Sequence, residues 1–149
     1  MRTICVVQAR LLSTRFDRKA MADLNGHPLI WHVVNRATQI KGVDRVVLAV
    51  PLRDGPVFSD VMAGTDVPVV CWPGIDENDV LARYLWTARF FQAEVVVRVT
   101  GDCPVLDPIV AGQVLELFHA SQPCDFASND TLVSGWPDGF DVAVFSRAA

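Results

Sequence analysis

The feature that most constrains the fold of this chain is a regular alternation of short apolar runs with amphipathic stretches. Four runs rich in valine and isoleucine occur in order, at Thr3–Val7, Arg45–Val50, Pro68–Cys71 and Glu94–Val99. They are apolar on successive residues, which is typical of strands that are covered on both faces. Because helical patterns separate the runs, the sequence predicts an α/β fold with a mostly parallel sheet between layers of helices.

The stretches between these runs have the spacing of helices. Helices are expected at Pro28–Ile40, Pro56–Ala63, Glu77–Phe91 and Asp107–Ala120. The last of these has a clear beginning, because Asp107 is a good N-cap and Pro108 suits the first helical position. After Ala120 the pattern changes, and two further short strands are expected at Cys124–Ala127 and Phe140–Phe145.

Length and composition limit the classes of protein. A chain of 149 residues with 51% hydrophobic residues is expected to form one folded domain over residues 1–149. The net charge of −4 gives no support to nucleic-acid binding, and no apolar run approaches the roughly 18 residues that span a membrane. The start of the chain lacks the pattern of a signal peptide, and the four cysteines lack metal-binding or disulfide spacing. We therefore expect reduced thiols and a cytoplasmic location.

A cluster of positive charge follows the first apolar run. Within Gln8–Lys19 the chain carries Arg10, Arg15, Arg18 and Lys19, although its overall charge is negative. Cations at the end of a first strand of an α/β sheet indicate an anion site, and a chain of phosphates is the expected anion. The segment contains no glycine, so side chains must neutralise the phosphates. The alternative is an ordinary solvated loop.

An acidic residue follows the fourth apolar run. In the order 3-2-1-4, which is usual for such sheets, the first and fourth strands are neighbours. Asp102, just after Gly101, is then expected to face the same crevice as the segment Arg10–Lys19. A carboxylate near bound phosphates favours Mg²⁺, which takes one or two carboxylates and completes its shell with water and phosphate oxygens. The alternative is that Asp102 is only a turn residue.

Five segments together resemble one family. The first is Gln8-Ala9-Arg10-x-x-Ser13-x-Arg15-x-x-x-Lys19. The others are Gly26-x-Pro28-Leu29-Ile30-x-His32-Val33, Asp79-Val80-Leu81-x-Arg83-Tyr84, Val99-Thr100-Gly101-Asp102-Cys103-Pro104 and Pro137-Asp138-Gly139-x-Asp141-Val142. In this order they resemble the cytidylyltransferases that make CMP-activated sugars, of the spore-coat polysaccharide and CMP-Kdo synthetase type. The likeness covers nearly the whole chain.

The resemblance implies a Rossmann-like, three-layer nucleotidyltransferase fold and a Mg²⁺-dependent reaction. A hydroxyl of an acidic or modified sugar would attack the α-phosphate of CTP, which gives a CMP-sugar for surface polysaccharide and pyrophosphate. Arg15 and Lys19 would neutralise the β- and γ-phosphates, and Asp102 would hold Mg²⁺. These three are the expected catalytic residues. A homodimer is the expected assembly.

The resemblance also implies residues that contact the nucleotide and the sugar. They are Ala9, Arg10, Ser13, Asp79 and Arg83 for the nucleotide, and Asp141 for the sugar. For Asp79 and Arg83 an alternative is open, since residues four apart on a helix can form an ordinary ion pair.

The chain also departs from the family pattern. Phe16-Asp17-Arg18 stands where the family commonly has Leu-Pro-Gly, and Ala143 stands where it commonly has Glu. Relative to the family the chain is short at its C-terminal end, and the part beyond would supply a second acid for the metal. Two other functions therefore stay open. One is a nucleotide-binding remnant or partner domain without catalysis. The other is a nucleotide-sugar glycosyltransferase, although the Asp-x-Asp motif of that class is missing.

Overall fold

The computed structural model describes residues 1–12, 16–72, 74, 79–130 and 135–148. In this part of the chain a six-stranded sheet has the order β5-β4-β1-β6-β8-β7. The strands are β1 (Thr3–Gln8), β4 (Arg45–Pro51), β5 (Val69–Trp72), β6 (Val95–Thr100), β7 (Phe126–Ser128) and β8 (Ala143–Ser146). Strands β1, β4, β5 and β6 pair in parallel, and β8 runs antiparallel to both β6 and β7. The predicted mostly parallel sheet, with the first and fourth apolar runs as neighbours, is confirmed.

The helices lie close to their predicted positions. They are α1 (Leu29–Ala37), α2 (Gly55–Val61), α3 (Val80–Phe90) and α4 (Pro108–Ala120), with short 3₁₀ turns η1 (Lys19–Met21) and η2 (Leu52–Asp54). Asp107 caps α4 as predicted and accepts hydrogen bonds from the backbone N–H groups of Ile109 at 2.7 Å and Val110 at 3.3 Å. The end predicted for the first helix is wrong by three residues. Ile40 is buried in the core, but it lies just after the turn that ends α1.

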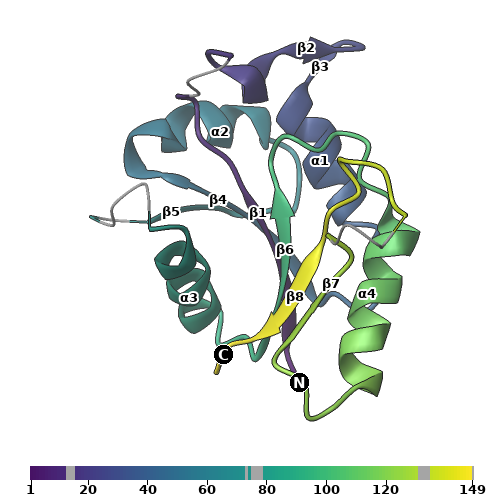
Figure 1. The fold of residues 1–149 in the computed structure, drawn as a ribbon. Coiled ribbons are helices and arrows are strands. Elements are labelled where there is room, and N and C mark those ends of the chain that lie inside the picture. Colours follow the sequence, from purple (N-terminus) through teal and green to yellow (C-terminus); the bar gives the residue numbers. More distant parts are fainter. Residues whose placement is uncertain (13–15, 73, 75–78, 131–134, 149) are drawn as a thin grey trace.

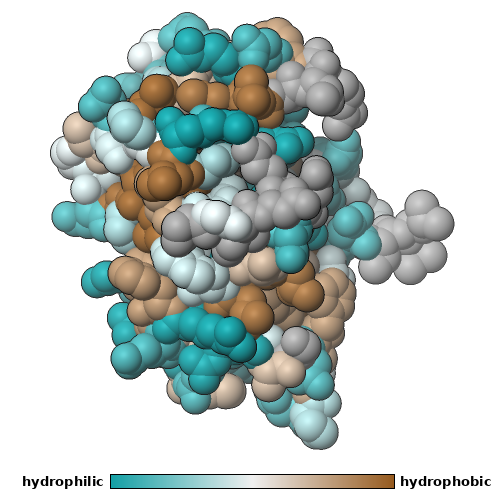
Figure 2. All heavy atoms as spheres, turned by 90° about the vertical axis from the view of Figure 1, so that its left-hand side faces the viewer, coloured by the Kyte–Doolittle hydropathy of each residue, from teal (hydrophilic) through white to brown (hydrophobic). Residues whose placement is uncertain are grey.

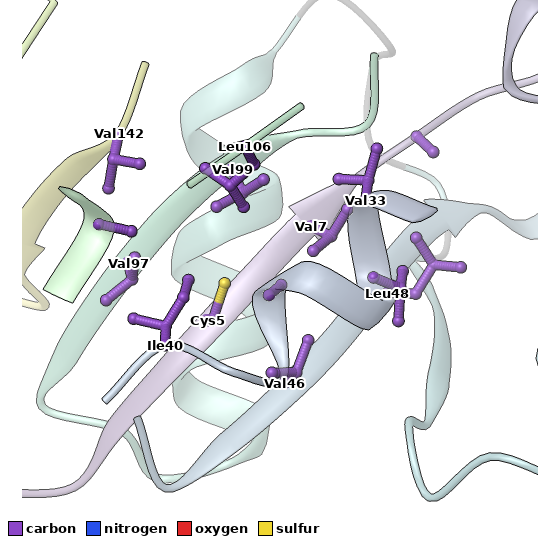
Figure 3. Close-up of a cluster of buried hydrophobic side chains, with 14 of the residues drawn as sticks. Cys5, Val7, Val33, Ile40, Val46, Leu48, Val97, Val99, Leu106 and Val142 are labelled. Carbon is purple, nitrogen blue, oxygen red and sulfur yellow. The ribbon is translucent and has the colours of Figure 1, made fainter. Parts of the chain in front are cut away.

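Side chains from alternate positions of the strands form two cores, one on each face of the sheet. Cys5 and Val7 of β1 point to the face that α1, α2 and α4 cover, as the close-up of this core shows (Figure 3). Ile4 and Val6 point to the other face, where α3 contributes Tyr84 and other buried side chains. The helices therefore lie on both sides of the sheet (Figure 1), and the three-layer prediction holds. Burial raises the pKa of the Cys5 thiol to about 12, as expected of a packed, unreactive cysteine.

A small hairpin was not predicted. Strands β2 (Asp23–Leu24) and β3 (His27–Pro28) pair antiparallel around Asn25 and Gly26, whose φ angles are 53° and 85°. Two positive φ values in a two-residue turn are what Asn-Gly favours in hairpins. The hairpin leads into α1, and His32 of that helix donates a hydrogen bond from Nε2 to the Leu24 carbonyl at 2.6 Å. The described chain contains no helix long and apolar enough to cross a membrane.

The backbone of the sheet is closely packed at Gly101, directly after β6. Its N–H donates to the Gln8 carbonyl at 2.8 Å, which extends the pairing of β1 with β6 by one residue. A Cβ atom at this position would lie 2.6 Å from that carbonyl oxygen and 2.9 Å from the Ala9 Cβ atom. Only glycine fits here, and this contact holds the segment after β6 against the end of β1.

We expect Gly101→Ala to lower the free energy of unfolding by about 1–3 kcal/mol, because the added methyl group forces the two strand ends apart. Gly112→Ala is the matched control. A Cβ at Gly112 of α4 meets nothing closer than 3.8 Å, so this change should be neutral or stabilise by up to about 1 kcal/mol. Urea unfolding of the two variants measures both values. If the two variants had equal free energies of unfolding, the close approach at Gly101 would not contribute to the stability of the fold.

Candidate functional site

Two charged side chains meet at the carboxyl edge of the sheet. Lys19 begins η1 in the segment that follows β1, and Asp102 lies two residues after the end of β6. The Lys19 Nζ atom lies 3.2 Å from the Asp102 Oδ2 atom. The two side chains come together because β1 and β6 are parallel neighbours and end at the same edge. The sequence-based expectation that both face one crevice agrees with this contact.

A buried carboxylate holds the beginning of the cationic segment. Asp54 is only 3% exposed and accepts a hydrogen bond from the Leu11 backbone N–H at 2.9 Å. The Leu11 carbonyl in turn accepts from the Arg18 N–H at 3.1 Å, which closes the segment into a loop. Arg18 has a φ of 51°, in the left-handed region that glycine adopts most easily. It occupies the position at which the resemblance has glycine, and the backbone keeps that conformation without it.

Asp102 lies in a polar turn. Cys103 is buried at 8% exposure, and its Sγ atom lies 3.1 Å from the Thr100 hydroxyl, so this cysteine packs into the turn. Partial burial tends to raise the pKa of Asp102. The ammonium of Lys19 and the Thr100 hydroxyl outweigh that effect and hold the pKa below its usual range. Asp102 is therefore an anion at neutral pH, as a metal ligand must be.

A cavity of about 320 Å³ surrounds the pair. It is lined by Lys19, Thr100, Asp102, Cys103, Pro104, Val105, Asp138, Gly139 and Asp141. Three carboxylates therefore share one cavity. Burial raises the pKa of Asp141, and the nearby charges of Asp130 and Asp138 add to the increase.

The residues of this cavity suit a hard divalent cation. Carboxylate oxygens are the ligands that Mg²⁺ prefers, and the Asp102 side chain lines the cavity and is 54% exposed to solvent. Within the described residues no three acidic, histidine or cysteine side chains are already placed as a metal cage.

The other predicted site residues are spread more widely. Ala9 is buried against Gly101, so packing accounts for its small size, and Arg10 is exposed beside it. Ser13 and Arg15 lie outside the described residues. Asp79 caps α3 by accepting from the Ala82 N–H at 3.0 Å.

Arg83 packs against an aromatic ring. Its guanidinium carbon lies 4.7 Å from the centre of the Trp72 ring, and the residue is 2% exposed. Neither Asp79 nor Arg83 lines the cavity around Lys19 and Asp102.

Three residues of the site were missed from the sequence. Asp54 stands in an ordinary turn sequence, and only the folded chain shows that it holds the loop backbone. Thr100 and Asp138 lie in segments that resemble the family, but the sequence predicted functional roles only for Asp102 and Asp141 in those segments. The Asp-Gly turn after Pro137 was the one available indication that Asp138 points into the site.

Fold and site together define an α/β protein with a cation and a carboxylate at the switch point of a parallel sheet, where nucleotides bind in folds of this class. The comparisons with known proteins give the family. Residues 4–134 match the family model described as "Cytidylyltransferase". The chain belongs to the cytidylyltransferase family.

Individual relatives agree with this assignment. The 3-deoxy-manno-octulosonate cytidylyltransferase of Serratia proteamaculans is 34% identical over 80% of this chain and 47% of that protein. A cytidylyltransferase structure from Leptospira borgpetersenii covers 99% of this chain and 61% of its own, with a TM-score of 0.89 and 24% identity. A CMP:2-keto-3-deoxy-manno-octonic acid synthetase solved with CTP has a TM-score of 0.81 and 16% identity, covering 99% of this chain and 75% of that one. The structural likenesses show the fold. The chain spans about half the length of the curated relatives it matches.

We expect Lys19→Met to raise the pKa of Asp102, because its main stabilising charge is lost. A lowered carboxyl pKa stabilises the fold above the pKa of the unfolded chain, and that stabilisation is lost as the pH falls below about 4. Both side chains are more than 40% exposed, so the loss at pH 7 should stay below about 1 kcal/mol.

An NMR titration of the Asp102 carboxyl group and urea unfolding at pH 7 and pH 3 measure the two effects. Lys41→Met is the control, because it removes the same charge from an exposed position away from the cavity. An unchanged Asp102 pKa in Lys19→Met would mean that the ion pair does not persist in solution.

Proposed function

We propose that this chain binds CTP with a divalent cation and transfers CMP to a hydroxyl group of a sugar acid, with release of pyrophosphate. The observation that carries the proposal is the pairing of Lys19 with Asp102 in a cavity at the switch point of the sheet. The relatives support CTP and an octulosonate as substrates, since those proteins are named 3-deoxy-manno-octulosonate cytidylyltransferases.

In this mechanism Lys19 changes partner when the nucleotide binds. Its ammonium turns from Asp102 to the β- and γ-phosphates, where it neutralises the negative charge that builds up on the leaving pyrophosphate. The hydrogen bond from the Leu11 N–H to Asp54 keeps the loop at the edge of the sheet during this exchange. Arg15 is proposed to share the phosphate charge, and Arg10 and Ser13 to contact the nucleotide.

Asp102 is the proposed metal ligand, with Asp138 or Asp141 across the same cavity as a second carboxylate. We propose Mg²⁺ as the metal, which when bound supplies positive charge at the α-phosphate. Release of Lys19 frees Asp102 for this role, so the two exchanges are coupled. Thr100 keeps the carboxylate oriented through the polar turn that it shares with Cys103.

Asp141 is proposed to accept a hydrogen bond from the sugar. Its pKa is raised by burial and by neighbouring carboxylates, so it is a better proton acceptor than an ordinary aspartate once ionised. Asp79 and Arg83 lie at the beginning of α3, away from this cavity. We propose that they contact the base and ribose of the nucleotide, and only the resemblance to the family supports this role.

Assembly and location are part of the same proposal. Helix α3 leaves Leu81 and Phe90 largely exposed, at 66% and 65%. The side of the molecule on which α3 lies shows hydrophobic patches among hydrophilic residues (Figure 2). We propose that a second copy covers part of this surface. The four cysteines are free, which supports a reducing compartment such as the cytoplasm. The proposed product would serve the synthesis of surface polysaccharide, as the resemblance implies.

The test is thermal unfolding with CTP, ATP, GTP and UTP, each with and without Mg²⁺, for the wild type, Lys19→Ala and Asp102→Ala. A ligand at 100 times its Kd adds about 2.7 kcal/mol of stability, which corresponds to a rise of roughly 5–15 °C in Tm. We expect a Mg²⁺-dependent rise for CTP that shrinks in both variants but not in the control Lys41→Ala.

Pyrophosphate release with CTP and 3-deoxy-manno-octulosonate then separates transfer from binding. A rise in Tm with CTP but no pyrophosphate would support the alternative of a nucleotide-binding domain without catalysis. No rise with any nucleotide would contradict the proposal as a whole.

A further inference from the structure

An arginine on β6 lies next to the site without a counter-ion among the described residues. Arg98 is two residues before Thr100, so the two side chains point to the same face of the sheet, the face that α3 partly covers. The Arg98 Nε atom is buried and has no hydrogen-bond partner in the described chain, and none of the ion pairs between described residues involves Arg98. A buried donor of this kind needs a reason, because leaving it unpaired is unfavourable.

The space beside Arg98 exists because its neighbours across the sheet are small. Arg98 pairs with Ala143 of β8, and Ala143 pairs with Ser128 of β7, so the three side chains form one row on the same face. Directly opposed residues in antiparallel strands have Cβ atoms about 5 Å apart, close enough for a long side chain at 143 to meet Arg98. Alanine leaves a recess of about 90 Å³ instead.

The recess adjoins the cavity around Lys19 and Asp102. Its lining consists of Arg98, Thr100, Ser128, Asp130, Asp141, Val142 and Ala143. Thr100 and Asp141 line both spaces. A molecule that is held in the larger cavity can therefore extend one polar group into the recess.

The charges of the recess select the group that enters. A guanidinium binds a carboxylate with two parallel hydrogen bonds. The carboxylates of Asp130 and Asp141 accept hydrogen bonds from sugar hydroxyls and repel an acid group that does not lie on Arg98. A ligand that carries one carboxylate and several hydroxyls satisfies both kinds of residue in a single orientation.

We propose that this recess is the carboxylate subsite for the acceptor sugar, and that Arg98 makes the chain select a sugar acid over a neutral sugar. The inference rests on the proposed function. The Tyr84 hydroxyl is buried beside Arg98. Burial raises the pKa of Tyr84 to about 12 although the neighbouring Arg98 side chain lowers it, so the tyrosine stays neutral.

The first experiment uses the unaltered chain. The arginine Nε–H signals in an NMR spectrum are followed during titration with 3-deoxy-manno-octulosonate and, separately, with its methyl ester, which has nearly the same shape without the charge. The signal missing from Arg98→Gln identifies Arg98. We expect that signal to move with the acid and to stay in place with the ester. Movement with both compounds, or with neither, would overturn the proposal.

Two variants test the same point through kinetics. Arg98→Gln should raise the KM for the octulosonate by at least roughly 10- to 100-fold, because that is the range for a single charge-assisted hydrogen bond and the guanidinium offers two, while the KM for CTP changes less than about twofold. Ala143→Glu should do the same and also raise Tm, because the new carboxylate pairs with Arg98 and fills the recess. Arg89→Gln, which removes an exposed arginine of α3, is the matched control.

The outcomes separate the inference from the proposed function. If CTP raises Tm and both variants keep the wild-type KM for the acid, the carboxylate subsite is wrong and the cytidylyltransferase proposal stands. If CTP does not bind, the proposed function fails, and the titration of the Arg98 Nε–H signal in the unaltered chain still decides whether the recess binds a carboxylate.

Discussion

The parallel pairing of β1 with β6 is the constraint on which the rest of the structure depends. It brings two segments that are about ninety residues apart in the sequence to one edge of the sheet, where Lys19 meets Asp102. Gly101 makes the approach possible, because a side chain there would collide with the end of β1. Asp54, in the 3₁₀ turn directly after β4, accepts a hydrogen bond from the backbone N–H of Leu11 in the segment that leads to Lys19. The segment is therefore attached to a buried residue close to the charged pair.

The sequence predicts the sheet well because strands buried on both faces are continuously apolar, and the short length and high valine content of these runs favour strands over helices. The order of the parallel strands follows from the handedness of their connections, and the position of Asp102 follows from that order. The small hairpin was missed because Asn25-Gly26 is not flanked by alternating apolar residues. Asp54 and Arg98 could not be identified, since their roles depend on what the fold places beside them rather than on their neighbours in the chain.

Around the cavity, positive and negative groups are divided between two ends. Lys19 approaches from the side of β1, where the proposed function places the phosphates. Asp138 and Asp141 approach from the side of β8, where the proposed function places the hydroxyl groups of the sugar. Arg98 is the cation proposed for the acceptor end. This division gives a physical reason for the proposed orientation of a nucleotide and a sugar acid, with the reacting atoms near Asp102.

The central claim is that the nucleotide binds at the edge of the sheet where β1 and β6 end. The most direct test is to map the backbone amide NMR shifts of the chain that change when CTP and Mg²⁺ are added. The largest changes are expected in residues 9–12, 16–22 and 100–106, the segments that follow the two strands. Changes concentrated at the opposite edge, around residues 42–44 and 92–94, would contradict the account.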